Sequence, residues 1–387
     1  MLTTLAVANY RSLRSLVMPM SSVNLVTGAN GSGKSNLYRA LRLLAETAQG
    51  GIVGALSREG GLGSTLWAGP EKFSKGMLAG TQPVEGLRRE HSISLRLGFA
   101  SDDFGYAIDL GFPVPSMSAF DFDPVIKSEV IFKGAFLRDA NKLIERKGPS
   151  ARSREGRSWR DIGGYLAPFE SIFTQVADPE RAPEVMLLRE TIRGWRFYDH
   201  FRSDVDAPAR SPQLATRTPV LSHDGRDLAA AWQTIREIGD VAALDAAVDD
   251  AFPGAHVSIA SEGSRLVLWF HQPGLLRPLS AGELSDGTLR YLLWIAALHT
   301  PRPPPLMVLN EPETSLHPDL LPALGRLILA TSTRSQVWVV SHASRLIATL
   351  EASDACHSVR LEKVLSQTAI QGQGMLDEPP WHWLAER

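Results

Sequence analysis

Cysteine is nearly absent from this chain: Cys356 is the only one among 387 residues, which excludes an intrachain disulfide framework. A lone cysteine fits a reducing compartment, and we expect a structural thiol rather than a reactive one. Long apolar runs are also lacking, since no stretch approaches the roughly 18 residues of a membrane span. The N-terminal stretch MLTTLAVANYRSL lacks the basic-then-apolar build of a signal peptide. These absences predict a cytoplasmic protein with no membrane partner.

Neither sign of charge dominates the sequence. The formal net charge is -2, so there is no global basic field, and nucleic-acid binding would need a local patch. A hydrophobic fraction of 44% and a charged fraction of 21% are ordinary for globular proteins and allow a sizeable core, in one large domain or two linked ones. No heptad pattern is long enough for a coiled-coil arm. The composition therefore predicts a folded chain without a long coiled coil.

A glycine-rich stretch near the start carries the clearest chemistry. SVNLVTGANGSGKSNLYRALRLLAET reads as an apolar strand, a turn and a helix, and residues 28–35 match G-x-x-x-x-G-K-[ST] without a gap. Glycines let the backbone curl so that its N–H groups point at phosphate oxygens, and the helix start adds partial positive charge. Glycine-rich turns also precede helices by chance, but the complete pattern in this setting predicts a nucleotide site.

The cofactors predicted for this site are ATP and Mg²⁺. Lys34 would reach the β- and γ-phosphates, and the Ser35 hydroxyl would bind the metal. The predicted nucleotide-binding residues of the loop are Gly28, Ala29, Asn30, Gly31, Ser32, Gly33, Lys34, Ser35 and Asn36.

Three further stretches follow in the second half of the chain. In PLSAGELSDGTLRYLLWIAALHT a turn opens an apolar helix expected over 289–298, and the simple interpretation of Ser285 and Asp286 is a helix N-cap. LMVLNEPETSLHP follows as an apolar strand that runs into polar residues. SQVWVVSHASRL is then a β-branched and aromatic strand that ends in Ser341 and His342.

Taken in order, these motifs resemble those of ABC-type ATPases of the RecF, SMC and OLD class. The chain is similar to the predicted bacterial AAA-type ATPases that carry LSDGT and EPETSLHP, and LAVANYRSL resembles the strand that opens such heads. The resemblance covers roughly residues 1 to 70 and 255 to 350. It implies an α/β P-loop NTPase head with an antiparallel β lobe and a mixed α+β insertion. Only 45 residues follow His342, so we expect no nuclease domain of the OLD type.

In the family that the chain resembles, two heads enclose two ATP molecules, and this implies a homodimer. By that resemblance Ser285 and Gly287 would bind the γ-phosphate of the nucleotide held by the other copy. His342 would contact the same phosphate, although a histidine at a strand end is otherwise a hydrogen-bonded structural residue. Glu311 would orient or deprotonate the attacking water. Lys34, Glu311 and His342 are thus the predicted catalytic residues, and Ser315, Leu316 and His317 would lie where the chain crosses the dimer interface.

Asn310 departs from the family pattern, which has an acidic metal-binding residue at this position. The side chain of asparagine keeps an oxygen acceptor but lacks the negative charge. A charge pair at about 4 Å is worth on the order of 4 kcal/mol at an effective dielectric of 20. We therefore predict that Ser35 and Asn310 bind Mg²⁺ weakly and that hydrolysis is slow. Glu313 is either a substitute for part of the missing charge or an exposed carboxylate on a loop.

Three segments are expected: 1–90 and 255–387 form the two parts of the head, and 91–254 forms the β lobe and insertion. HSISLRLGFA and FGYAIDLGFP alternate like antiparallel strands, and the stretch from about 225 to 254 reads as one or two helices that end near Pro253. Residues 147–160 are basic and rich in small side chains, which predicts a mobile loop that is either solvated or in contact with phosphates. The tail MLDEPPWHWLAER would dock on the head or on a partner.

Arginines and aromatic residues alternate over 189–202. They would either grip nucleic acid or cover buried aromatic rings with their aliphatic stems. Gln213 and Gln272 are candidates, without further support, for the glutamine that senses Mg²⁺ in many ABC heads.

The leading function is an ATP-gated switch in a DNA transaction such as repair or phage defence. The alternative is a regulatory ATPase that controls a separately encoded effector protein. The third option, the ATP-driving subunit of a membrane transporter, would normally read L-S-G-G-Q and D-E-P-T, which are not present.

Overall fold

The computed structural model describes residues 1–71, 73–78, 81–83, 93–374 and 376–383. The chain divides into two compact units, each built from segments distant in sequence. Unit 1 contains Met1–Met20, Thr27–Gly194 and Val359–Arg387, and unit 2 contains Ser21–Val26 and Trp195–Ser358. Among the described residues, no helix combines the length and apolar character that a membrane crossing requires.

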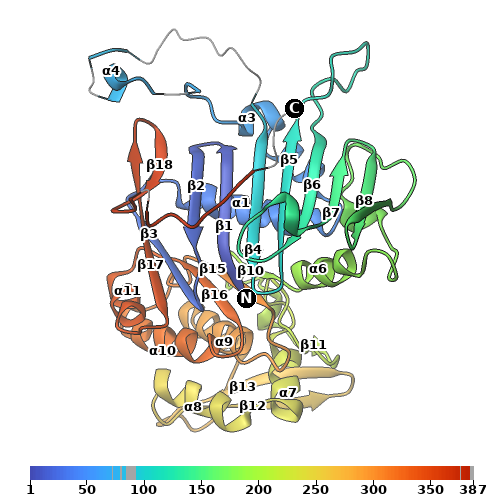
Figure 1. The fold of residues 1–387 in the computed structure, drawn as a ribbon. Coiled ribbons are helices and arrows are strands. Elements are labelled where there is room, and N and C mark those ends of the chain that lie inside the picture. The colour runs from blue at the N-terminus through green and yellow to red at the C-terminus, as the bar shows by residue number, and fades with distance from the viewer. Residues whose placement is uncertain (72, 79–80, 84–92, 375, 384–387) are drawn as a thin grey trace. The chain divides into compact units, whose positions relative to one another are not determined.

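Unit 1 is built on an eight-stranded antiparallel sheet with the order β2-β1-β4-β5-β6-β7-β8-β9. Figure 1 shows these strands from β2 to β8 in blue to green. The strands are β1 (Leu2–Tyr10), β2 (Leu13–Pro19), β4 (Leu95–Ser101), β5 (Phe104–Gly111), β6 (Val125–Lys133), β7 (Lys142–Lys147), β8 (Ser150–Glu155) and β9 (Ser158–Asp161). The prediction of antiparallel strands at HSISLRLGFA and FGYAIDLGFP is confirmed by β4 and β5, although His91 and Ser92 lie outside the described residues.

The helices of unit 1 include the one that follows the phosphate loop. They are α1 (Lys34–Thr47), α2 (Ile52–Arg58), α3 (Leu62–Thr65), α4 (Lys75–Leu78), α5 (Ile172–Gln175) and α6 (Pro183–Arg193). In α1 the side chains of Leu37, Leu41 and Leu44 are buried, which is the apolar stripe expected of a helix packed on one face. A hairpin of β17 (Cys356–Val364) and β18 (Gln367–Ile370) also contributes to unit 1 through its later residues.

A buried ion pair between β6 and β7 also holds the start of α5. Arg146 Nη1 lies 2.9 Å from Glu129 Oε2, and neither side chain is exposed. The other acceptor sites of Glu129 are filled as well: the hydroxyls of Tyr106 and Ser171 each donate to Oε1 at 2.6 Å, and Ile172 N donates to Oε2 at 3.0 Å. A buried charge is tolerated when its partners compensate for lost hydration, so loss of one partner would be costly.

The prediction of a mobile loop over 147–160 is wrong, because this segment forms β8 and β9. Its inward side chains are the small Ala151 and Ser153, so the alternation typical of a strand is hidden from a hydrophobicity pattern. On the other side Arg152 lies with its Cζ atom 4.5 Å from the centre of the Trp159 ring. Stacking on the ring and pairing of Arg152 with Glu145 give the arginine fixed contacts in place of a solvated loop.

The predicted docking of the C-terminal tail occurs within unit 1. Trp381 lies against Phe132 with ring centroids 5.9 Å apart, and Trp383 lies 5.4 Å from Trp381. These rings cover a small buried cluster that includes Val130 and Phe132 on the β lobe. Met375 and residues 384–387 of the same tail lie outside the described residues.

Unit 2 combines a parallel sheet with an antiparallel one. The parallel strands occur in the order β10 (Arg196–Tyr198), β15 (Leu306–Asn310), β16 (Gln336–Val340) and β3 (Val23–Gly28), of which Val23–Val26 belong to this unit. Nearly every residue of β15 and β16 is buried, which explains their continuous apolar runs. The antiparallel strands are β11 (Gln213–Leu214), β12 (His256–Glu262), β13 (Arg265–His271) and β14 (Leu279–Ser280).

Five α-helices complete unit 2 in the part of the chain that the structure describes. They are α7 (Leu228–Ile238), α8 (Val241–Ala251), α9 (Asp286–Leu298), α10 (Leu321–Thr331) and α11 (Ser344–Glu351). Figure 1 shows α7 and α8 beside the β12–β13 hairpin, which confirms the helices predicted before Pro253. The longest described helix of the whole chain, α1, has 14 residues, so the described residues form no long coiled coil.

The core of unit 2 explains two sequence features. Tyr198 and Phe201 are fully or almost fully buried and pack with Trp294, so the aromatic residues of the 189–202 segment serve the core rather than an exposed base-stacking surface. Cys356 packs against the same core, and burial raises the pKa of its thiol to about 11. The thiol therefore stays protonated at neutral pH, as a structural cysteine should.

Candidate nucleotide site

The phosphate loop runs from the end of β3 to the start of α1, in unit 1. Gly28, Gly31 and Gly33 all have positive φ angles, of 142°, 78° and 112°. A Cβ atom at Gly28 would lie 2.4 Å from Leu361 O, and one at Gly33 would lie 2.0 Å from Thr368 Oγ1. A Cβ atom at Gly31 would meet nothing within 4 Å. Glycine is therefore required at positions 28 and 33 by both conformation and space, and at position 31 by conformation alone.

Lys34 closes over its own loop. Its Nζ atom donates to Gly28 O at 2.6 Å and to Ala29 O at 3.1 Å, while Ala29, Asn30 and Gly31 lie toward the surface. In the described residues no side chain caps the start of α1, so the first N–H groups of this helix are available to an anion. An uncapped helix start with a lysine ammonium at its base has the donor set that a polyphosphate requires.

A polar network supports the loop from behind. Asn36 Nδ2 donates to Ser12 Oγ at 2.8 Å, the hydroxyls of Ser12 and Thr368 lie 2.7 Å apart, and Thr368 Oγ1 donates to Ser32 O at 2.8 Å. Ser32 Oγ is buried, and it has no hydrogen-bond partner among the described atoms. Ser12 belongs to the LAVANYRSL stretch, whereas no motif in the sequence marks Thr368, which is 356 residues away. Asn36 thus contributes to the support of the loop, and its predicted contact with nucleotide stays a prediction.

The LSDGT turn begins helix α9 in unit 2. Ser285 is the N-cap: its Oγ accepts from Thr288 N at 3.1 Å, as the simple interpretation predicted. Asp286 accepts from Arg210 Nη2 at 2.6 Å, and Arg210 Nη1 also donates to Leu284 O at 2.7 Å. Ser285 and Asp286 remain exposed, so the turn presents a hydroxyl and a helix start at the surface of its unit. No motif in the sequence marks Arg210.

The turn lies directly against the loop that follows β15. A Cβ atom at Gly287 would lie 3.0 Å from Ser315 O, and Ser315 has a φ of 64°. Arg290 Nη1 donates to Thr314 O at 2.8 Å, and Trp294 Nε1 donates to Pro312 O at 3.0 Å. Helix α9 thereby fixes the loop through three successive contacts, and the structure brings the predicted Gly287 and Ser315 together.

The polar end of β15 contains the predicted catalytic glutamate. Asn310 is the last residue of the strand and pairs with Val340 of β16. Glu311 follows with a φ of 49°, a left-handed conformation that costs roughly 1 kcal/mol for a non-glycine residue, and its N–H donates to Val340 O at 2.8 Å. A strained residue that its neighbours hold in place often marks a functional position. Here the strained residue is Glu311, which is predicted to orient or deprotonate the attacking water.

The expectation that Glu313 is an exposed carboxylate is wrong. Only 7% of the residue is exposed, and its Oε1 accepts from Ser341 Oγ at 2.7 Å and from His342 N at 2.8 Å. Its carboxylate therefore joins the loop after β15 to the turn after β16. His342 itself is mostly exposed, with Nδ1 3.2 Å from Glu313 Oε1.

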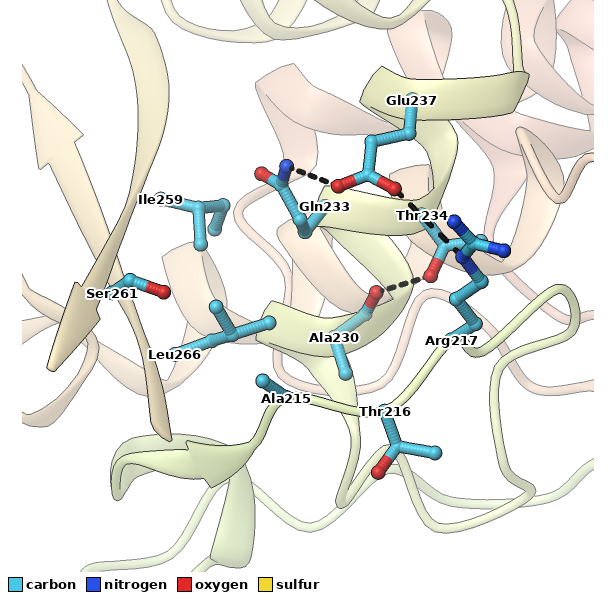
Figure 2. A pocket seen from close by; sticks show the side chains of 10 residues that line it. All are labelled: Ala215, Thr216, Arg217, Ala230, Gln233, Thr234, Glu237, Ile259, Ser261 and Leu266. Carbon is cyan, nitrogen blue, oxygen red and sulfur yellow. Dashed lines mark hydrogen bonds and ion pairs between the residues drawn. The ribbon is translucent and has the colours of Figure 1, made fainter. Parts of the chain in front are cut away.

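Two other regions of unit 2 have no part in this arrangement. Gln213 accepts from Ala229 N at 2.7 Å through its buried amide, which fixes the start of α7, whereas Gln272 is exposed. A cavity of about 440 Å³ lies between α7 and the β12–β13 hairpin. Figure 2 shows the side chains that line it. Its polar rim is paired internally, since Gln233 Nε2 donates to Glu237 Oε1 at 2.9 Å. None of the motif residues lines this cavity.

Comparisons with known proteins agree with this architecture. The model of a family described as "AAA domain, putative AbiEii toxin, Type IV TA system" matches residues 23–348. No curated protein matches the chain. A structure of the SmcHead bound to the C-winged helix domain of ScpA aligns with a TM-score of 0.50 at 13% identity, covering 97% of this chain and 98% of that chain. The predicted ATPase-head fold is thereby confirmed.

Two other SMC heads align with lower scores. The SMC head domain from Thermotoga maritima has a TM-score of 0.45 at 14% identity, with 95% of this chain and 97% of that chain covered. The Smc head domain with an extended coiled coil, bound to the C-terminal domain of ScpA derived from Pyrococcus furiosus, has a TM-score of 0.46 at 13% identity, with 95% of each chain covered.

Proposed function

The chain belongs to this AAA domain family, and from that premise we propose that it is a slow ATPase that acts as a nucleotide-gated homodimeric switch in a DNA transaction such as repair or phage defence. The observation that carries the proposal is the phosphate loop. Its glycine conformations, the Lys34 ammonium and the uncapped start of α1 provide the donors that a nucleotide triphosphate needs.

Each catalytic group has a defined task in this proposal. Lys34 and the loop N–H groups neutralise charge on the phosphates, Glu311 orients the attacking water, and His342 contacts the γ-phosphate. Ser35 and Asn310 would hold Mg²⁺, which supplies positive charge to the phosphate oxygens when bound. Since Asn310 offers an oxygen without a negative charge, it would hold the metal weakly, and turnover would be slow.

The dimer follows from the LSDGT turn. Ser285 lies exposed at the start of α9, where its hydroxyl and the helix N-terminus suit a γ-phosphate held by a second copy of the chain. The ATP-bound state would then be the closed one, because only triphosphate offers a group for the second copy to bind.

Molecular mass and phosphate release, measured together, test the proposal. Light scattering after gel filtration, with Mg²⁺ and with or without ATP, is expected to show a monomer that becomes a dimer with ATP while little phosphate appears. Lys34→Ala should abolish ATP binding and dimerisation, and Ser285→Arg should abolish dimerisation alone. Ser264→Arg, at the exposed β12–β13 turn, is the matched surface control. A wild-type chain that binds ATP but keeps one mass in both states would contradict the switch.

DNA binding distinguishes this function from its alternative. We expect duplex DNA to bind more tightly with ATP than without it, with affinity that falls steeply with salt. The alternative is a regulatory ATPase that controls a separately encoded effector. The family description names a putative toxin of a type IV TA system, which is compatible with a protein partner. If DNA binding is absent in both nucleotide states and an effector co-purifies with wild type but not with Lys34→Ala, the alternative replaces the DNA function.

A further inference from the structure

Glu313 occupies an unusual place among the carboxylates of unit 2. It lies in the loop after β15, two residues beyond Glu311, and its side chain is only 6% exposed. Three donors converge on its Oε1 atom: Ser341 Oγ at 2.7 Å, His342 N at 2.8 Å and Ala343 N at 3.2 Å. All three belong to the turn between β16 and α11. One buried carboxylate oxygen thus fixes the backbone on which His342 stands.

The same oxygen also faces the imidazole of His342. Nδ1 lies 3.2 Å from Glu313 Oε1, while 63% of the His342 side chain is exposed. A carboxylate next to Nδ1 favours a proton on that nitrogen, because the N–H dipole then points its positive end at the negative oxygen. Nε2, on the other side of the ring, is consequently directed away from Glu313.

Helix α9 holds the carboxylate in place from its other flank. Trp294 donates to the carbonyl oxygen before Glu313, at Pro312, and Arg290 donates to the carbonyl oxygen after it, at Thr314. Arg290 is itself buried and also donates to Phe201 O at 3.1 Å. Glu313 therefore has little freedom to move, since the carbonyl groups of the residues before and after it are anchored.

We propose that Glu313 is the positioning residue of His342: it fixes the turn after β16 and keeps the proton of the neutral imidazole on Nδ1, so that Nε2 faces outward. This inference rests on the proposed function for its catalytic consequence, because His342 is there the residue that contacts the γ-phosphate. Glu313 acts through His342 and has no contact with substrate of its own. The buried Oε2 atom, which lacks a partner among the described atoms, is compatible with this role, since the three donors to Oε1 compensate the charge.

The first test measures the tautomer of His342 and needs no activity. In protein with ¹⁵N-labelled histidine, the His342 signals are assigned by their loss in His342→Gln and recorded at a pH at which the ring is neutral. Wild type is expected to have the proton on Nδ1. Glu313→Ala removes the acceptor beside that nitrogen and should shift the proton to Nε2. Glu313→Gln, whose amide oxygen takes the place of Oε1 among the three donors, should keep the proton on Nδ1. Ser341→Ala, which removes one donor but keeps the charge, should also leave the tautomer unchanged. An unchanged tautomer in Glu313→Ala would overturn the proposal.

The second test asks whether the two residues act as a unit. Glu313→Ala and His342→Gln should each lower ATP turnover by about ten- to a hundredfold, and the double variant should be no slower than His342→Gln alone. Affinity for ATP should be unchanged in Glu313→Ala. Glu351→Ala, at an exposed carboxylate on α11, is the matched control. Full turnover in Glu313→Ala, or fully additive losses, would refute the inference. A wild-type chain without ATP turnover would refute the proposed function, while the tautomer still decides the role of Glu313.

Discussion

Substitution of the loop glycines offers a matched pair in which only packing differs. Gly31→Ala puts a side chain at a φ of 78° with nothing within 4 Å, so its cost is the left-handed conformation, about 1–2 kcal/mol. Gly33→Ala has a φ of 112°, and its Cβ would lie 2.0 Å from Thr368 Oγ1 and 2.9 Å from Thr368 Cβ. Overpacking adds about 1–3 kcal/mol, and displacement of Thr368 costs about 1 kcal/mol for each hydrogen bond lost. We expect a total of about 3–6 kcal/mol from these contributions.

The assay is urea unfolding without nucleotide, monitored by tryptophan fluorescence, so that loss of phosphate contacts does not enter. Gly33→Ala should lower the free energy of unfolding by at least about 2 kcal/mol more than Gly31→Ala does. Thr368→Ala removes Oγ1 and Cγ2, two of the three colliding atoms, and should recover part of the loss in the Gly33→Ala background. Equal losses for the two glycine variants would refute the reasoning. So would a Thr368→Ala change that costs as much in the Gly33→Ala background as it does alone.

Three further changes have defined outcomes. Asn310→Asp restores the missing charge and should tighten Mg²⁺ or raise turnover by at least about tenfold in a metal titration of phosphate release; an unchanged rate and metal dependence would contradict our account. Burial and the charge of Arg334 lower the pKa of His299 from 6.5 to about 4 in the folded chain. As the pH falls below 7, the unfolded chain binds a proton at His299 before the folded chain does, so the free energy of unfolding decreases. His299→Gln should therefore remove about 2 kcal/mol of the stability lost between pH 7 and pH 5, and an identical pH slope in both proteins would argue against it. Trp381→Ala should lower the unfolding free energy by about 2 kcal/mol through lost contact with Phe132, whereas an unshifted thermal transition would show that the tail contributes nothing.

The sequence predicted the parts of the site that depend on spacing along the chain. The phosphate loop needs glycines and a lysine at fixed offsets before a helix, and Ser285 needs only a following helix to act as a cap. The spacing of the loop residues and the position of Ser285 before a helix are local features of the sequence. They can therefore be recognised before any tertiary contact is known. The apolar runs of β15 and β16 likewise predicted strands, and burial within a parallel sheet explains their composition.

The parts that the sequence did not predict depend on contacts between distant residues. Glu313 is surrounded by polar neighbours in sequence, and only the turn after β16 makes it a buried acceptor. Arg210 supports the LSDGT turn from 76 positions away in the chain. The β8 strand was missed because its inward residues, the small Ala151 and the polar Ser153, do not mark a buried face in a hydrophobicity pattern. In each case a tertiary partner overrides what local composition indicates.

The hydrogen bond from Thr368 to Ser32 joins residues 336 positions apart, and this spacing orders events during synthesis. The phosphate loop is made early, whereas β18, the strand that supports it, is translated after all the other described strands. Until then the glycine-rich loop of a nascent chain lacks the hydrogen bond from Thr368 that supports it. Because long-range contacts must await the later partner, the loop reaches its final conformation only after Thr368 has left the ribosome. Ribosome-bound chains should consequently acquire nucleotide affinity abruptly and late, in step with β18 rather than with α1.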